Sequence, residues 1–177
     1  MDNEKKMSPD MRQRYIINTL KNAHQPVTGS ELAKQTNVSR QVIVQDISIL
    51  KAKNEPIIAT SQGYMYIKQQ PTTIQQIVAV HHSPERTKEE LYLLVDHGVT
   101  VKDVIVEHPV YGDLTASIMV SNRLEVDRFI QHITETKSTY LSMLTNGTHL
   151  HTIEADSMEK LNLAKEALQK ANFLLES

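Results

Sequence analysis

Two histidines separated by one residue, His149 and His151, are the side chains of this sequence best suited to chemistry. They lie in a run of strand-forming residues from about His149 to Ile153, and alternate residues of a strand point to the same side. Both imidazoles are therefore expected to face one way while Leu150 faces the other. Two imidazoles on one face can bind a divalent transition metal ion together. Such a pair is a weak signal by itself, because most histidines lie at the surface or make ordinary hydrogen bonds.

Two further metal ligands are available upstream. His82 ends a predicted strand over about residues 76–82, and Glu90 is expected on the following helix, beside Leu94. Neighbouring residues of a strand face opposite sides, so only one of His81 and His82 faces the site, and the spacing to Glu90 favours His82. Three nitrogens and one carboxylate oxygen suit one Ni²⁺, Zn²⁺, Fe²⁺ or Mn²⁺ ion per chain, with a position left open for a ligand.

The elements that must position these residues follow from hydrophobic periodicity and capping signals. Helices are predicted to begin at Ser83-Pro84, at Asn122 (with Glu125 completing a capping box) and at Asp156. Strands are predicted over about residues 76–82, 101–107, 113–120 and 149–153. The order β-α-β-β-α-β-α predicts an α+β fold, an open-faced sandwich with helices on one side of an antiparallel sheet.

The N-terminal part has a different pattern, two short helices joined by a tight turn between Thr28 and Lys53. Thr28 can cap the first helix, with Glu31 completing a capping box, and Ser39 can cap the second. A buried stripe on the second helix is formed by Ile43, Ile47 and Leu50. The pair fits a helix-turn-helix that enters a DNA major groove, and it also fits a helical hairpin in any small bundle.

The flanking segments favour the DNA-binding interpretation. A helix over about Pro9 to Asn22 would complete a three-helix core, and residues 56–67 predict a β-hairpin that turns at Gly63. A hairpin directly after a recognition helix resembles the wing of bacterial winged-helix repressors. The residues expected to contact DNA bases are Arg40, Gln41, Val44 and Gln45, with Ser39 at the helix start, and those expected to contact phosphates are Lys51, Lys53 and Gln62.

Composition supports two domains, residues 1–70 for DNA binding and 71–177 for regulation, joined at the polar segment 68–73. Residues 1–70 contain 10 Lys+Arg and 6 Asp+Glu (+4), whereas residues 71–177 contain 9 and 15 (−6), which sums to the net charge of −2. A basic N-terminal part and an acidic C-terminal part fit a protein that binds nucleic-acid phosphates only through its N-terminal part. The chain has no cysteine, no long apolar run and a polar start, so we expect no disulfides, no membrane association and a cytoplasmic location.

Three segments resemble the signature segments of the 3H domain, which follows a winged helix in the NiaR (YrxA) family of niacin-responsive repressors. They are His82–Leu91, Asp103–Gly112 (with Glu-His-Pro-Val-Tyr-Gly) and Gly147–Ile153 (Gly-Thr-His-Leu-His-Thr-Ile). The resemblance covers about residues 8–175 and implies an HPr-like βαββαβα sandwich, consistent with the element order above. It further implies that the domain binds nicotinic acid and that a divalent metal is held by His82, Glu90, His149 and His151.

Other residues near the signature segments are candidates for binding the ligand. They are His108, Tyr111, Thr148 and Arg86. His108 could bond the ligand carboxylate or orient a metal ligand, and it could equally bond the backbone of the turn over residues 109–112. Arg86 is the nearest basic residue in sequence that could pair with a carboxylate.

Together these features predict a transcriptional repressor of NAD-biosynthesis or niacin-uptake genes, with nicotinic acid as co-repressor. Two winged helices must span operator half-sites about one helical turn, ~34 Å, or a multiple of it apart, so a homodimer on double-stranded DNA is expected. One alternative is a repressor that senses the metal itself. A second is a small metal-dependent enzyme, against which the sequence offers no clear additional general base and no nucleophile motif, so we expect no enzymatic activity.

Overall fold

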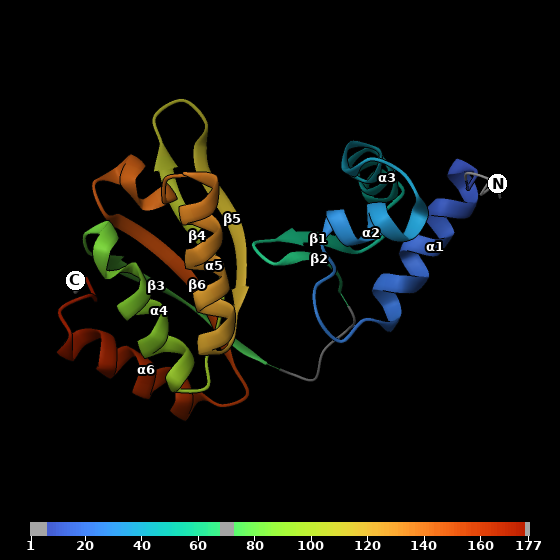
Figure 1. The fold of residues 1–177 in the computed structure, drawn as a ribbon. Helices are drawn as coiled ribbons and strands as arrows, with labels where there is room; N and C mark the ends of the chain where they lie inside the picture. Colours follow the sequence, from blue (N-terminus) through green and yellow to red (C-terminus); the bar gives the residue numbers. More distant parts are fainter. Residues whose placement is uncertain (1–6, 68–72, 176–177) are drawn as a thin grey trace. The chain divides into compact units, whose positions relative to one another are not determined.

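The computed structural model describes residues 7–67 and 73–175, and the chain divides into two compact units near residue 70 (Figure 1). The predicted linker, residues 68–73, lies outside the described residues except for Thr73. Within the described ranges, no helix is both long and apolar enough to cross a membrane.

The N-terminal unit consists of three helices followed by a two-stranded hairpin. Its elements are α1 (Pro9–Asn22), α2 (Gly29–Thr36), α3 (Arg40–Ala52), β1 (Ile57–Thr60) and β2 (Gly63–Tyr66). The hydroxyl of Thr28 accepts a hydrogen bond from the Glu31 backbone N–H at the start of α2, and Ser39 does the same for Val42 at the start of α3. The predicted stripe of α3 is buried in the core of this unit, which contains Ile16, Leu20, Leu32, Ile43, Ile47 and Leu50.

The hairpin turn differs from the prediction. Gly63 does not form its tip but is the first residue of β2, paired with Thr60, so the turn residues are Ser61 and Gln62. The glycine is required for another reason: a Cβ at Gly63 would lie 2.6 Å from the backbone oxygen of Val27. Val27 forms an isolated bridge with Tyr64, and this close approach ties the hairpin to the segment before α2.

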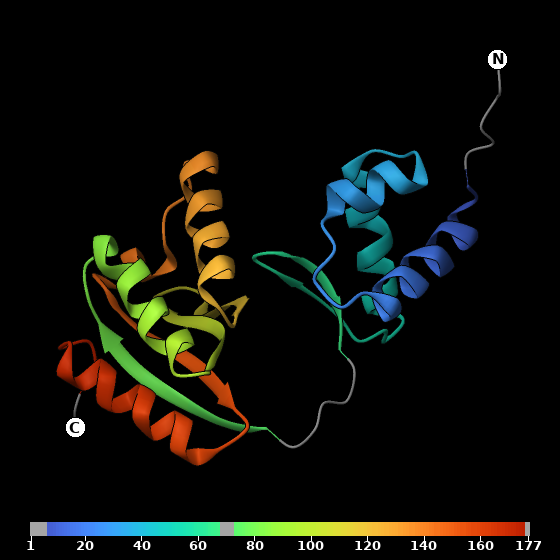
Figure 2. The same ribbon diagram turned by 60° about the horizontal axis from the view of Figure 1, so that its bottom comes forward.

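The C-terminal unit has the predicted β-α-β-β-α-β-α order, with two short 3₁₀ turns added. Its elements are β3 (Ile74–His81), η1 (Pro84–Arg86), α4 (Thr87–Asp96), β4 (Thr100–His108), β5 (Gly112–Val120), α5 (Arg123–Thr136), η2 (Leu141–Thr145), β6 (Thr148–Ala155) and α6 (Met158–Lys170). The four strands pair antiparallel in the order β3-β6-β4-β5. Helices α4, α5 and α6 lie on one side of this sheet (Figure 2).

Two helix starts differ from the prediction. Pro84 begins a 3₁₀ turn, and α4 follows only from Thr87. The N-cap of α6 is Ser157 rather than Asp156: the Ser157 hydroxyl accepts a hydrogen bond from the Lys160 backbone N–H, while the Asp156 carboxylate pairs with the Lys160 ammonium group. Serine is as good a cap as aspartate, so composition alone could not choose between the two neighbours.

At α5 the predicted cap holds in part. The Asn122 side chain accepts a hydrogen bond from the Glu125 backbone N–H, as a capping residue does. The Glu125 carboxylate, however, bonds the backbone N–H and the hydroxyl of Ser121 rather than returning to Asn122. The helix therefore begins where predicted, with the reciprocal bond moved by one residue.

Strand alternation decides which side chains meet the helices. On β6, His149, His151 and Ile153 are buried on the helix side, whereas Leu150 and Thr152 between them face the other side of the sheet and are partly exposed. The helix side also holds the apolar core of this unit, whose largest fully buried members include Phe173, Leu91, Leu94, Ile153, Leu161 and Leu168. His149 and His151 therefore lie at the edge of the apolar core between the sheet and the helices.

Candidate metal centre

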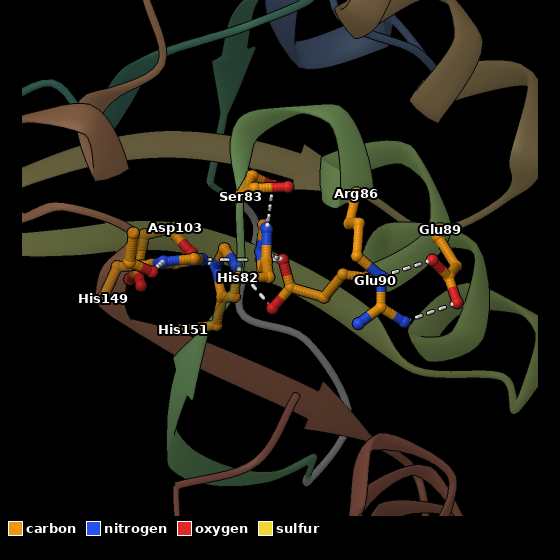
Figure 3. A network of polar contacts seen from close by, with 9 residues as sticks. His82, Ser83, Arg86, Glu89, Glu90, Asp103, His149 and His151 are labelled. Atoms are coloured by element: carbon orange, nitrogen blue, oxygen red, sulfur yellow. Dashed lines mark hydrogen bonds and ion pairs between the residues drawn. The ribbon is translucent and has the colours of Figure 1, made fainter. Parts of the chain in front are cut away.

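Three imidazoles surround one carboxylate at the end of this core. The side chain of Glu90, on α4, is fully buried, and its Oε2 lies 2.6 Å from His82 Nε2 and 3.5 Å from His149 Nε2. Its other oxygen, Oε1, lies 3.4 Å from His151 Nε2 (Figure 3). His82 directly follows β3, Glu90 lies on α4, and His149 and His151 lie on β6, which the fold brings together. His81, by contrast, is exposed and bonds Thr148.

The backbone sets the orientation of all three rings. The Nδ1 atoms of His82, His149 and His151 lie 2.7, 2.9 and 2.6 Å from the backbone oxygens of Ser83, Gly147 and Asp103. A carbonyl oxygen only accepts hydrogen bonds, so each Nδ1 carries a proton and each Nε2 points toward Glu90. His82 Nε2 donates a hydrogen bond to Glu90 Oε2 in this metal-free form, and an Nε2 that has lost its proton can offer its lone pair to a metal ion. This is the arrangement that outer-shell partners impose on metal-binding histidines.

The cluster leaves polar atoms without hydrogen bonds. Among the described side chains, Glu90 Oε1 and His151 Nε2 are fully buried and have no hydrogen-bond partner, although they lie close to each other. Such atoms are costly in a protein interior, where nearly all polar groups are paired. One ligand atom each from His82, Glu90 and His149 lie within 4.8 Å of one another. Two nitrogens and a carboxylate oxygen with this spacing fit a divalent transition metal ion. His151 Nε2, 3.4 Å from Glu90 Oε1, is the candidate for a further ligand.

The charges of the cluster in its metal-free form also favour the binding of a cation. Burial disfavours the charged form of Glu90, but the surrounding imidazoles, first His151 and then His149 and His82, hold the pKa of Glu90 well below its usual range. Burial also disfavours charge on His82 and His151, yet Glu90 raises the pKa of both imidazoles, at His82 through a hydrogen bond and its negative charge and at His151 through its negative charge. The site is therefore built to hold positive charge against a buried carboxylate, as protons or as a metal ion.

The predicted DNA-contacting residues lie on the outer side of α3 and around it. Arg40, Gln41 and Gln45 are exposed and Val44 is partly exposed, on the side of α3 opposite its buried stripe. The Ser39 hydroxyl is engaged as the helix cap. Of the residues predicted to contact phosphate, Lys51 is exposed, Lys53 donates to Gln13 on α1, and Gln62 lies in the hairpin turn with its backbone N–H bonded to Thr60.

Comparisons with known proteins agree with both halves of this architecture. Residues 75–177 match the family model of the 3H domain, and residues 12–65 match that of an HTH domain. Over 178 residues the chain is 54% identical to the transcription repressor NadR of Bacillus subtilis, an alignment that covers 99% of each protein. Over 165 residues it is 42% identical to the probable transcription repressor NiaR of Thermotoga maritima, covering 93% of this chain and 94% of that one. The chain belongs to the NiaR/NadR family of transcription repressors.

Membership of the NiaR/NadR family bears on the alternatives left open by the sequence. The resemblance to this family and the α+β fold with an N-terminal helix-turn-helix are confirmed. Both relatives are named transcription repressors, in agreement with the prediction that the chain is not an enzyme. The metal and nicotinic acid are not part of those names.

Three of the residues predicted to bind the ligand make their contacts away from the cluster. His108 accepts hydrogen bonds at Nδ1 from the backbone N–H groups of Val110 and Tyr111, which is the turn-bonding role considered for it. The Tyr111 ring packs on His108 and is 75% exposed. Thr148 lies on the face of β6 opposite His149, where it meets His81. For these three residues, ligand binding in this NiaR/NadR-family protein stays a prediction.

Arg86 has a structural role that the sequence did not show. Its guanidinium makes two hydrogen bonds to Glu89, donates to the backbone oxygen of Ala171 and lies 4.0 Å from the centre of the Phe173 ring. Phe173 in turn packs edge-on against His82, with ring centres 5.2 Å apart. Arg86 thus supports the cluster of His82, Glu90, His149 and His151 through Phe173. The contact of Phe173 with His82 joins two distant parts of the sequence, so no local pattern could predict it.

Gly147 is a second position whose structural role the sequence did not show. Its φ is +94°, and a Cβ there would lie 2.3 Å from the backbone oxygen of His82. The Gly147 oxygen accepts hydrogen bonds from the His82 backbone N–H and from His149 Nδ1. A single glycine therefore fixes the distance between the two histidines that arrive from different strands.

Gly147→Ala is expected to weaken metal binding about 10- to 100-fold, as loss of an outer-shell support does, because the new methyl group must push His82 away. Metal affinity measured by competition with a chromophoric chelator checks this. Gly112→Ala is the matched control: Gly112 also has a positive φ, +69°, but open space around its Cβ position. It should carry similar backbone strain and keep the affinity of the parent protein, and an equal loss in both variants would contradict the role given to Gly147.

Proposed function

We propose that this protein is a transcriptional repressor of NAD-biosynthesis or niacin-uptake genes that uses nicotinic acid as co-repressor. Residues 1–70 would bind the operator and residues 71–177 would bind the effector and a divalent metal ion. The observation that carries the proposal is the buried cluster of three imidazoles around Glu90, in a chain that also has a helix-turn-helix and belongs to a repressor family.

The cluster of three histidines around Glu90 suits nicotinate because of the ligand atoms that it offers to a metal ion. His82, Glu90, His149 and His151 would supply three nitrogens and one oxygen, and a metal ion so held keeps a position open for one more ligand. The carboxylate or the pyridine nitrogen of nicotinate can fill such a position. The protein's own contribution is to hold the three Nε2 atoms in place through the backbone oxygens of Ser83, Gly147 and Asp103.

The N-terminal unit would recognise the operator sequence. Arg40, Gln41 and Gln45 stand exposed on α3, where an amide can pair with adenine and a guanidinium with guanine in the major groove. The hairpin β1-β2 would lie beside the groove as a wing, with Gln62 at its turn. Nicotinate would favour the dimer geometry in which the two α3 helices fit half-sites one helical turn, or a multiple of it, apart. The ratio of its affinities for this geometry and for the others sets the largest change in DNA affinity that it can cause.

A gel-shift titration tests the proposal, with upstream DNA of the organism's own NAD-biosynthesis or niacin-transport genes. Nicotinate is expected to tighten binding of the metal-loaded protein by about 5- to 150-fold, the usual range of coupling between two sites. Chelation should cancel this gain, and Arg40→Ala should weaken binding with and without nicotinate. DNA affinity that ignores nicotinate in the metal-loaded protein would contradict the co-repressor role.

The metal-sensing alternative rests on the same buried cluster and predicts a different response. In that case DNA affinity follows the metal concentration, and nicotinate has no effect at any metal level. The same titration distinguishes the two proposals when metal and nicotinate are varied independently.

A further inference from the structure

The side of the C-terminal sheet opposite the helices carries an apolar patch, which we call the open face. Its centre is formed by Ile77 and Ala79 of β3, Leu150 of β6 and Ile105 of β4. Leu150 is paired with Ala79 on one side and with Ile105 on the other, so three of these residues form one row across the sheet. Ile77 is 63% exposed, although it lies in the middle of a strand.

Polar and charged residues border this patch at both ends of the strands. At one end, the Lys102 ammonium pairs with the Glu154 carboxylate at 3.3 Å, and Gln75 bonds the same carboxylate. At the other end, His81 on β3 and Asp113 on β5 lie on opposite edges of the sheet. An apolar centre with a polar rim is the usual anatomy of a protein interface.

We infer that the open face is the surface through which two copies of this chain pair. The inference rests on the proposed function, which requires two winged helices, and it adds where the copies meet. Its support is self-complementarity: a twofold axis parallel to the strands places β3 over β5 of the second copy and β6 over β4. Leu150 then faces Ile105 and His81 faces Asp113, each contact occurring twice.

The size of the face predicts a moderate affinity. Four strands spaced ~4.8 Å apart and about eight residues long at ~3.3 Å each cover roughly 500 Å² per copy. Two such faces together come near the lower limit of specific interfaces, about 1,000 Å². The dimer should therefore dissociate on dilution, and each apolar residue at its centre should matter.

The same strand connects this face to the metal cluster. Leu150 lies between His149 and His151 on β6 and points to the opposite side. Asp103 ties the strands together here, because its backbone oxygen accepts a hydrogen bond from His151 and its carboxylate accepts one from the Thr152 backbone N–H. A ligand that holds His149 and His151 in place thus also holds β6, the strand from which Leu150 would contact the second copy.

The first test is the mass of the full-length, zinc-loaded protein in solution, measured by sedimentation over a range of concentrations without DNA or nicotinate. Ile77→Glu should raise the dimer dissociation constant at least ~30-fold, as loss of an interface hot spot does. Leu124→Glu is the matched control, since Leu124 is 60% exposed but lies on α5, on the helix side of the sheet. A monomeric parent protein, or an Ile77→Glu variant that stays as dimeric as the control, would overturn the inference.

The second test uses the absence of cysteine from this chain. The twofold arrangement places Ile77 of one copy over Ser117 of the other, because Ile77 and Ser117 occupy the same row at opposite edges of the sheet. Facing sheets lie ~10 Å apart, too far for a disulfide, so Ile77→Cys and Ser117→Cys proteins are mixed with a short bis-maleimide and should form a cross-linked heterodimer. Mixing Ile77→Cys with Leu124→Cys should not, and equal cross-linking in both mixtures would contradict the predicted pairing.

Both tests are independent of the proposed effector. If the dimer forms through the open face but nicotinate leaves DNA binding unchanged, the proposed co-repressor fails and the interface stands. If nicotinate tightens DNA binding but Ile77→Glu leaves the dimer intact, the copies meet elsewhere and the proposed function stands.

Discussion

Glu90→Gln is expected to abolish stoichiometric metal binding, with affinity at least ~100-fold weaker than in the parent protein, beyond the loss typical of an outer-shell partner. The amide keeps the shape of the fully buried side chain but removes the negative charge that the three imidazoles surround. Without that charge, a divalent cation would sit among neutral nitrogens in a buried site. Metal content after dialysis against zinc, measured by mass spectrometry of the metal, checks the prediction.

Glu89→Gln is the matched control for this variant. Glu89 is the preceding residue on α4, but its carboxylate is half exposed and pairs with Arg86 outside the cluster. This variant should bind one metal ion per chain with unchanged affinity. A Glu90→Gln protein that folds and keeps a full equivalent of metal would show that the carboxylate only orients the histidines.

The same charges give the direction of the pH dependence. The pKa values of His82 and His151 are raised by Glu90 in the metal-free form, so protons occupy these imidazoles at higher pH than in a free histidine. The metal must displace those protons, and its apparent affinity should therefore fall as the pH decreases through the raised pKa values. In the Glu90→Gln protein the raised values lose their cause, and what affinity remains should depend less steeply on pH.

Most of the fold could be predicted because its signals are local. Capping residues such as Thr28, Ser39 and Asn122 and the 3.6-residue stripe of α3 are recognised within a few residues of the chain. Strand alternation, which is equally local, predicts that His149 and His151 share one face of β6, as they do. The misplaced features, the role of Gly63 and the cap of α6, were decided by contacts or by a choice between two equally suitable neighbours.

The supports of the candidate site could not be predicted, because each joins segments far apart in sequence. Phe173 meets His82, Asp103 holds His151, and the backbone oxygen of His82 packs on Gly147. None of these pairs has a spacing that periodicity can detect. The ligands themselves are chemically distinctive residue types, whereas their supports are backbone atoms, a glycine and an aromatic ring that occur in any core.

A buried ion pair in the N-terminal unit is the other feature that the sequence hid. Asp46 lies next to Ile47 on the buried side of α3 and is 2% exposed. Its carboxylate accepts hydrogen bonds from Arg12 Nε at 2.5 Å and from Gln13 Nε2 at 3.1 Å, both on α1. Lys53, at the end of α3, donates to the Gln13 side chain and closes the network. These contacts fix α3, the proposed recognition helix, against α1.

Asp46→Ala is accordingly expected to destabilise the N-terminal unit by about 3–5 kcal/mol, because it leaves the buried guanidinium of Arg12 without its partner. A unit of this size has a free energy of unfolding on the order of 3–10 kcal/mol, so the N-terminal unit of the variant should unfold often enough to lose much of its protection from hydrogen exchange. Hydrogen exchange of the α1 and α3 amides in the full chain measures this. Asp10→Ala, on the exposed first turn of α1, is the control and should cost less than ~1 kcal/mol.

The double variant Arg12→Met/Asp46→Leu separates the charge from the packing. Replacing a buried ion pair by apolar residues of similar volume is often neutral or stabilising, so the exchange protection lost in Asp46→Ala should largely return. If the double variant recovers protection and still binds the operator, the ion pair contributes through compensation of its own buried charges. If it recovers protection but loses operator binding, Arg12 and Asp46 are needed to set the angle of α3 toward DNA. Protection that stays lost in the double variant would contradict the assignment of the destabilisation to an unpaired buried charge.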